Sequence, residues 1–202
     1  MKPNYITNIY LEMTPNPSTL KFAADRFISQ TEGVEFDRNT PRALKNTNNL
    51  IQVLLNFPFI ERIFVLENYI SITKNQDLEW MEIQEQLRVL IKEHLQEVQW
   101  AFLAEEYVAQ SSPILAETQK AIFEPSEHDQ TIIDLLQEYV QPAVSNDGGE
   151  IVFAGLKEGI VFVQMRGACN GCPSSTATLK DGIERLMKQM LPDLVKEVRA
   201  II

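Results

Sequence analysis

The sequence predicts an α+β protein made of two small α+β domains joined by a partly helical bridge. Short apolar segments bounded by turn residues indicate strands in both halves of the chain. Segments with apolar residues at three- and four-residue spacing indicate amphipathic helices in the same halves. Between the halves lies an apolar stretch that contains two proline breaks. We therefore expect one domain over residues 1–97, the bridge over 98–126 and a second domain over 127–202.

The first domain is expected to open with two strands, 6–13 and 19–23, separated by the sequence Thr14-Pro15-Asn16-Pro17. Two prolines so close together exclude a helix or a central strand at that point, because proline cannot donate a backbone hydrogen bond. A helix is expected over residues 43–55, where apolar residues recur at helical spacing and Pro58 follows soon after.

A hairpin and a long helix are expected in the rest of the first domain. Segments 62–66 and 69–73 have the composition of strands, and the polar dipeptide Glu67-Asn68 between them predicts a tight turn. The following helix carries one apolar stripe, made up of Trp80, Ile83, Leu87, Leu90, Ile91, Leu95 and Val98. Because a stripe of this kind buries itself against another element, we expect it to face the hairpin.

The bridge combines apolar residues with chain breaks. Its apolar residues are Trp100, Phe102, Leu103, Tyr107 and Val108. The sequences Ser111-Ser112-Pro113 and Glu124-Pro125-Ser126 interrupt the chain on either side of a short helical stretch. Since the segment is too apolar for a plain flexible linker, we expect it to be partly helical and to pack against other residues.

The second domain is expected to begin with an amphipathic helix over 132–144, ended by Asn146-Asp147-Gly148-Gly149. Pro142 should kink the last turn of this helix, because it has no N–H to donate to the carbonyl of residue 138. The remaining elements are two strands around a Lys157-Glu158-Gly159 turn, a helix and a final strand, over 150–154, 160–166, 173–191 and 195–202.

Charge and apolar content exclude several classes of function. The chain has 28 acidic and 18 basic side chains and a formal net charge of −10, the opposite of what a nucleic acid or an anionic membrane surface attracts. No apolar run approaches the roughly 20 residues of a transmembrane helix. The first residues resemble neither a signal peptide nor a transit peptide. We therefore expect a soluble cytoplasmic protein that binds neither nucleic acid nor membranes.

Two cysteines form the most informative motif. Cys169 and Cys172 are the only cysteines of the chain, in the sequence GACNGC at 167–172, directly after an expected strand. Pro173 follows, and proline favours the first position of a helix, so the free N–H groups of that helix should point at the thiols. A helix N-terminus favours thiolate over thiol. We therefore expect Cys169 and Cys172 to bind a metal or to form a redox pair.

Three kinds of site use cysteines at this spacing. A thioredoxin-like dithiol oxidoreductase requires a βαβ unit ahead of the motif, whereas a hairpin is expected here. A zinc site requires two more ligands, and the only histidines, His94 and His128, lie on polar stretches where we expect surface side chains. A [4Fe-4S] cluster requires four thiolates, which two copies of the motif related by a two-fold axis would supply. The third interpretation leads, and a dithiol oxidoreductase or a zinc-stapled structural dimer stay open as alternatives.

In the leading interpretation the cluster is bridged between the two chains of a homodimer. The site would be open to solvent on at least one side and the cluster labile, which suits a protein that hands its cluster on. We therefore expect a carrier and not an enzyme, with no catalytic residue. Neither cysteine is expected to fill a core, so the fold should survive replacement of either one by serine.

The two halves of the chain also resemble a known family. Residues 132–201 resemble the NifU-like C-terminal domain of iron–sulfur scaffold and carrier proteins, through Gln141-Pro142-Ala143-Val144, Asp147-Gly148-Gly149 and GACNGCPSSTATLKDGIE at 167–184. The first 97 residues resemble the N-terminal domain of Nfu-type scaffolds, through Met13-Thr14-Pro15-Asn16-Pro17, Leu20-Lys21-Phe22 and Ile63-Phe64-Val65.

This resemblance implies an iron–sulfur cluster assembly protein that holds a [4Fe-4S] cluster between two subunits, with Cys169 and Cys172 as the ligands. It implies that apo iron–sulfur client proteins receive the cluster and that upstream scaffold proteins donate it. The chain lacks the further cysteines of full-length NifU, which favours a late-acting carrier over an assembly scaffold. The resemblance assigns no catalytic residue to either domain.

Overall fold

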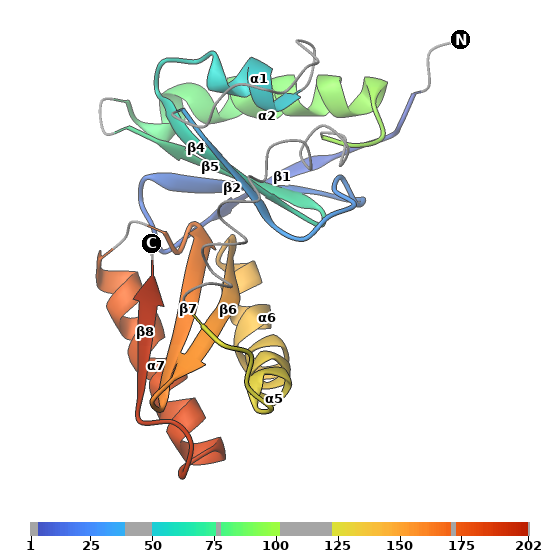
Figure 1. Ribbon diagram of the computed structural model, residues 1–202. Coiled ribbons are helices and arrows are strands. Elements are labelled where there is room, and N and C mark those ends of the chain that lie inside the picture. Colours follow the sequence, from blue (N-terminus) through green and yellow to red (C-terminus); the bar gives the residue numbers. More distant parts are fainter. Residues whose placement is uncertain (1–3, 39–49, 76–77, 102–122, 171–172, 202) are drawn as a thin grey trace. The chain divides into compact units, whose positions relative to one another are not determined.

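The chain divides into two compact units, residues 1–110 and 111–202. The structure, a computed structural model, describes residues 4–38, 50–75, 78–101, 123–170 and 173–201. Both units contain helices and a sheet (Figure 1). The predicted α+β class is therefore confirmed. The expected boundaries at 97 and 127 stay predictions, because most of the bridge lies outside the described residues.

The first unit contains an antiparallel sheet in the order β1-β2-β5-β4-β3. Its strands are β1 (Ile9–Met13), β2 (Thr19–Ala24), β3 (Val34–Asp37), β4 (Ile60–Leu66) and β5 (Tyr69–Lys74). Four of them lie where the sequence predicts strands, and β4 and β5 form the expected hairpin, with Glu67 at φ +47° in its turn. The short edge strand β3 was not predicted from the sequence.

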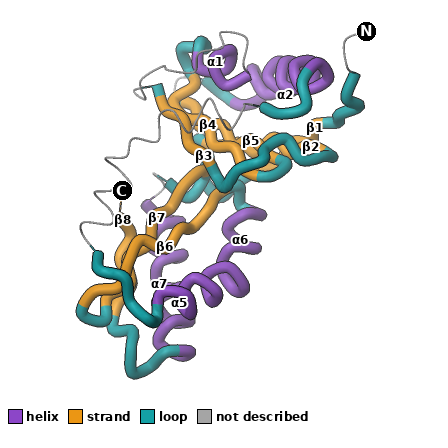
Figure 2. The backbone as a smooth tube through the Cα atoms, turned by 45° about the vertical axis from the view of Figure 1, so that its right-hand side comes forward, coloured by secondary structure: helices purple, strands orange, loops and turns teal. Residues whose placement is uncertain are grey.

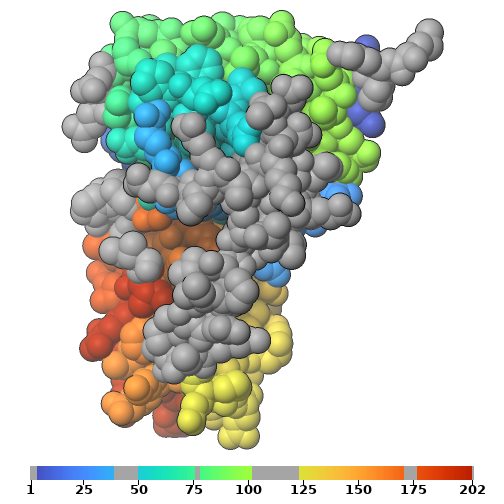
Figure 3. All heavy atoms as spheres, turned by 45° about the horizontal axis from the view of Figure 1, so that its top comes forward, coloured from blue at the N-terminus to red at the C-terminus, as the bar shows by residue number. Residues whose placement is uncertain are grey.

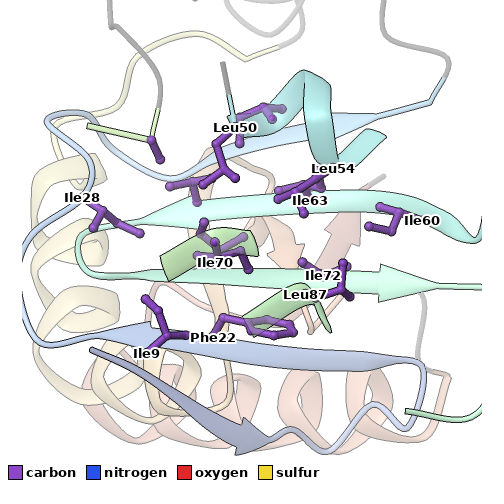
Figure 4. Close-up of a cluster of buried hydrophobic side chains, with 14 of the residues drawn as sticks. Ile9, Phe22, Ile28, Leu50, Leu54, Ile60, Ile63, Ile70, Ile72 and Leu87 are labelled. Atoms are coloured by element: carbon purple, nitrogen blue, oxygen red, sulfur yellow. The ribbon is translucent and has the colours of Figure 1, made fainter. Parts of the chain in front are cut away.

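Two helices cover one face of this sheet, α1 (Leu50–Leu55) and α2 (Trp80–Glu97). Residues 43–49 of the expected first helix lie outside the described residues. The space-filling view shows α1 and α2 side by side on one surface (Figure 3). Figure 4 shows the core beneath them, in which the fully or nearly fully buried side chains include Phe22, Leu50, Leu54, Ile63, Ile70, Ile72 and Leu87. The predicted apolar stripe of α2 faces this core, with Leu90 and Val98 only partly buried.

The guanidinium of Arg26 closes the C-terminal end of α2. It donates to the carbonyls of Leu95 at 2.6 Å and Val98 at 3.0 Å, and also to the carbonyl of Gln99. Its Nε donates to Thr7 Oγ1 at 2.8 Å. The last carbonyls of a helix have no hydrogen-bond donor within the helix, and they carry partial negative charge. A guanidinium placed there donates hydrogen bonds to them and also balances their charge.

The double-proline sequence forms a rigid turn that is tied to α2. Thr14 Oγ1 donates to the carbonyl of Thr19 at 2.8 Å, and the backbone N–H of Asn16 donates to Thr14 Oγ1 at 3.2 Å. The indole N–H of Trp80 donates to the carbonyl of Pro17 at 3.0 Å. The turn expected between the first two strands is therefore present and held from two sides.

The second unit has a three-stranded sheet in the order β6-β7-β8, and Figure 2 shows its helices on one side of that sheet. Strands β6 (Gly149–Lys157) and β7 (Ile160–Gly167) are antiparallel, and β8 (Glu197–Ile201) is parallel to β7. The helices are α5 (Asp129–Leu135), the π-helical turn η1 (Leu136–Val140), α6 (Gln141–Asn146) and α7 (Pro173–Met190). The core between them includes Ile132, Leu136, Val144, Ile151, Val161, Val163, Met165, Ile183, Met187 and Val198.

The predicted kink before Pro142 takes the form of the π-helical turn. The N–H of Gln141 donates to the carbonyl of Leu136, five residues back. Because Pro142 has no N–H, the ordinary hydrogen-bond ladder is interrupted here, and one wider turn accommodates the gap. The side-chain carbonyl of Gln141 then accepts the N–H of Ile151 at 3.1 Å and links this helix to the start of β6.

Both described ends of the bridge pack on a unit. Ala101 is buried in the core of the first unit, and its N–H donates to the carbonyl of Ile28 at 2.9 Å. The ring of Phe123 lies against Phe162 of β7, with ring centroids 4.7 Å apart, and occupies the space that a side chain at Gly155 would need. Residues 102–122 lie outside the described residues.

Stability of the second unit should fall in acid because Glu184 is held ionised. The pKa of this carboxyl is lowered from its usual 4.5, first by the hydrogen bond from Lys188 and then by the backbone N–H of Val198 at 3.0 Å. A lowered folded pKa contributes stability that is present above pH 4.5 and is lost as the pH falls below it. Urea unfolding at pH 6 and below pH 4 should show this loss, and Glu184→Gln, which keeps an acceptor for Val198, should show less of it.

Candidate functional site

The candidate site lies in the loop that joins β7 to α7. Helix α7 begins at Pro173, as the sequence predicts. Cys169 lies within the described part of this loop, whereas Gly171 and Cys172 lie outside the described residues. The structure therefore places one of the two predicted ligands.

Backbone hydrogen bonds hold the loop against the end of α6. The N–H of Ala168 donates to the carbonyl of Gly148 at 3.1 Å, and the N–H of Asn170 donates to the carbonyl of Gly167 at 3.1 Å. Gly148 and Gly167 have φ angles of +82° and +67°, in the region that favours glycine. The predicted helix end at Asn146 is confirmed. The turn at Gly148 that follows this helix also binds the cysteine loop through the N–H of Ala168.

Cys169 is buried in the core of the second unit, with 7% of its surface exposed. The expectation that neither cysteine fills a core is therefore wrong for Cys169. A cysteine thiol packs as a small apolar group, and the loop turns it toward the face where Val163 and Met165 are buried. In this conformation of the chain, the sulfur is shielded from solvent.

The absence of a side chain at Gly149 leaves room for the sulfur of Cys169. A β-carbon built on Gly149 would lie 2.8 Å from Cys169 Sγ, 3.3 Å from Cys169 Cβ and 2.8 Å from the carbonyl oxygen of Arg166. From the sequence alone, Gly149 is expected only as part of the helix stop. The signal that could have found it is the second glycine in Asp147-Gly148-Gly149, since one glycine is enough to end a helix.

The charged side chains of Glu150 on β6 and Arg166 on β7 pair with each other and not with the sulfur of Cys169. Arg166 Nη1 lies 3.4 Å from Glu150 Oε2, and Arg166 Nη2 donates to Gln164 at 3.1 Å. Glu150 and Arg166 are cross-strand partners. Side chains alternate between the two faces along a strand. The side chain of Glu150 therefore lies on the face of the sheet opposite the one on which Gly149 meets Cys169.

The histidines do not complete a metal site in the described part of the chain. His128 is exposed and precedes α5, as expected. His94 is half-buried on α2 of the first unit, and burial lowers the pKa of its imidazole. The expectation of a plain surface side chain is therefore wrong for His94, because α2 turns part of that residue inward. Among the described residues, no group of three or more His, Cys, Asp or Glu side chains could hold a metal ion.

None of the helices in the described ranges has the length and apolar character needed to cross a membrane.

Comparison with known families accounts for both units. A model of the NifU-like domain matches residues 132–199, and a model described as the scaffold protein Nfu/NifU N-terminal domain matches residues 9–98. The two matches together cover most of the chain, and the first contains both cysteines.

Individual relatives match nearly the whole chain. NifU-like protein 4, mitochondrial, of Arabidopsis thaliana is 31% identical over 195 residues, which are 96% of this chain and 64% of that protein. The human protein named NFU1 iron-sulfur cluster scaffold homolog, mitochondrial, is 27% identical over 191 residues, 92% of this chain and 69% of that protein. The chain thus spans about two thirds of the length of these relatives. The solution structure of a NifU-like protein from Saccharomyces cerevisiae aligns with a TM-score of 0.41 at 19% identity over 52% of this chain and 88% of that one.

Proposed function

The chain belongs to the Nfu/NifU family of iron–sulfur cluster scaffold proteins, and from that premise we propose that it carries a [4Fe-4S] cluster, bridged between two copies, to apo-proteins. The ligands in this proposal are Cys169 and Cys172 of each copy. The observation that carries it is that the chain has these two cysteines and no others.

The number of thiolates supports a shared cluster. Four thiolates are the usual complement of a [4Fe-4S] cluster, and one chain offers half of them. The identical loop of a second copy, related by a two-fold axis through the cluster, would supply the other two thiolates. Two-fold symmetry is the commonest symmetry of protein dimers. The start of α7 at Pro173, directly after Cys172, also favours an anionic group at the loop.

A carrier suits this chain better than an enzyme. A thioredoxin-like dithiol oxidoreductase has a βαβ unit ahead of its cysteine pair, whereas the antiparallel hairpin β6–β7 precedes the pair here. The chain also has no further cysteines for a second cluster, which a larger assembly scaffold would use. The expected partners are therefore a second copy of the chain, an upstream scaffold that donates the cluster and apo iron–sulfur clients that receive it.

Thiolate ligands need a compartment that keeps thiols reduced, and the cytoplasm is the one that we propose. The plant and human relatives carry the word mitochondrial in their names. Cell fractionation with an antibody against the chain decides between the two compartments. Detection in the mitochondrial fraction of a eukaryotic source would overturn the cytoplasmic assignment.

Anaerobic reconstitution with iron and sulfide should give a brown protein with one [4Fe-4S] cluster for every two chains. The reason is that each chain supplies two of four thiolates. Native mass spectrometry should show a cluster-bound dimer and a largely monomeric cluster-free chain. A monomer that holds four irons without an added external thiol would contradict the proposal.

The same samples distinguish the alternatives. A zinc-stapled dimer would reconstitute with zinc alone and remain colourless. A dithiol oxidoreductase would reduce a disulfide substrate without iron, and a Cys-to-Ser variant would trap a mixed disulfide on a non-reducing gel. Neither result is expected for a cluster carrier.

A further inference from the structure

We propose that Gly149 is a positioning residue for the cluster ligand Cys169, and that its missing side chain forms the seat in which the thiol lies in the cluster-free chain. This inference rests on the proposed function, because it treats Cys169 as a cluster ligand. The contact itself is independent of any cluster. The seat consists of Gly149 on β6, facing Cys169 in the loop after β7.

The geometry shows that only glycine leaves this space open. A β-carbon at position 149 would lie 2.8 Å from Cys169 Sγ, far inside the roughly 3.5–4.0 Å at which non-bonded heavy atoms pack. The sulfur therefore occupies the volume that any other side chain at 149 would take. Gly149 pairs with Gly167 across the strands, so neither strand places a β-carbon at this register position.

The conformation of Gly149 does not by itself require glycine. Gly148, Gly159 and Gly167 are the described glycines with positive φ, and Gly149 is not among them. Its backbone is that of an ordinary strand residue in β6. The reason for a glycine at 149 is therefore space, and the group that uses the space is the ligand thiol together with the carbonyl of Arg166.

The seat determines when the thiol is available. With 7% of its surface exposed, Cys169 cannot reach an iron that a second chain also binds unless its side chain leaves the core. Gly149 thus favours the withdrawn position in the cluster-free chain, and a β-carbon there would push the sulfur outward. Withdrawal lowers the reactivity of the thiol until a cluster is delivered.

Alkylation of a single thiol tests the seat without any cluster. In Cys172→Ser protein, Cys169 is the sole thiol. Adding Gly149→Ala should raise its rate of alkylation by iodoacetamide at fixed pH by at least about tenfold, because a buried thiol is inert whereas an exposed one can ionise and meet the reagent. A rate within twofold of the Cys172→Ser parent, with an unchanged circular dichroism spectrum, would overturn the proposal.

Two other glycines provide matched controls. Gly182→Ala adds a methyl group on α7 with no atom within 4 Å, and should leave the rate unchanged. Gly155→Ala lies on the same strand as Gly149 but meets the ring of Phe123 instead, so it perturbs β6 away from the thiol. If Gly155→Ala raises the alkylation rate as much as Gly149→Ala does, general loosening of β6 explains the effect and the seat is wrong.

A double-mutant cycle keeps the proposal testable even if Gly149→Ala is poorly folded. Cys169→Ala removes the sulfur and leaves the clash with the carbonyl of Arg166 in place. The shift in urea midpoint caused by Gly149→Ala should therefore be smaller in the Cys169→Ala background, by the part that the sulfur contributes. Equal shifts in both backgrounds would refute a contact with the sulfur. Since none of these measurements involves iron, they stand or fall separately from reconstitution, which tests the proposed function.

Discussion

Replacing Cys169 with serine should abolish cluster uptake and also lower the free energy of unfolding of the second unit. The variant removes two of four thiolates from the proposed dimer, and a hydroxyl oxygen is a harder, poorer ligand for cluster iron. It also places a hydroxyl in a core position that is 7% exposed. Serine is also smaller than cysteine, so packing contacts of the sulfur in the core are lost. Iron and sulfide content after reconstitution and urea unfolding of the apo-protein measure the two effects.

Two companion variants separate ligation from packing. Cys169→Ala should lose the cluster equally, without placing a polar group in the core, so the difference in stability from Cys169→Ser reports the cost of the hydroxyl. Cys172→Ser should lose the cluster as well. Wild-type iron content in both serine variants would show that these cysteines are not the ligands.

Replacing Arg26 with alanine should lower the free energy of unfolding of the first unit by about 2–3 kcal/mol, the scale of hydrogen bonds to a charged group. The variant removes the guanidinium that binds the carbonyls of Leu95, Val98 and Gln99 at the end of α2. Those carbonyls then depend on water, and the favourable charge at the helix C-terminus is lost. Chemical unfolding followed by the fluorescence of Trp80 and Trp100 reports this unit, since both tryptophans lie in it.

Arg26→Lys is the matched control for charge. Lysine keeps the positive charge but cannot match the forked geometry of a guanidinium, so it should recover only part of the loss. Cluster uptake by the second unit should remain at the wild-type level in both variants. Full recovery with lysine would show that charge alone, and not the set of hydrogen bonds, stabilises the end of α2.

Segments with a strong local pattern could be predicted from the sequence. The β4–β5 hairpin follows from two apolar runs around Glu67-Asn68, and the apolar stripe of α2 runs from Trp80 to Leu95 in the core. Strand β3 has only four residues, Val34–Asp37, which is too short for a period to be recognised. Its pairing with β4 depends on contacts distant in sequence, which local propensity does not encode.

The position of the candidate site between a strand and a helix could be predicted, but the burial of Cys169 could not. The spacing of Cys169 and Cys172 and the proline after them pointed to thiolate chemistry at a helix start, and α7 does begin at Pro173. The burial of Cys169 could not be predicted, because the alternation of β7 ends at Gly167, where a positive φ redirects the chain. The space beside Gly149 depends on the pairing of β6 with β7, which one strand alone does not reveal.

The anchored ends of the bridge limit how far the cargo can be from the first unit. Ala101 is held by the first unit and Phe123 by the second, so the two anchors are joined by a fixed length of chain. Covalent geometry limits the 22 steps from Ala101 to Phe123 to a reach of about 75 Å, at about 3.4 Å a residue.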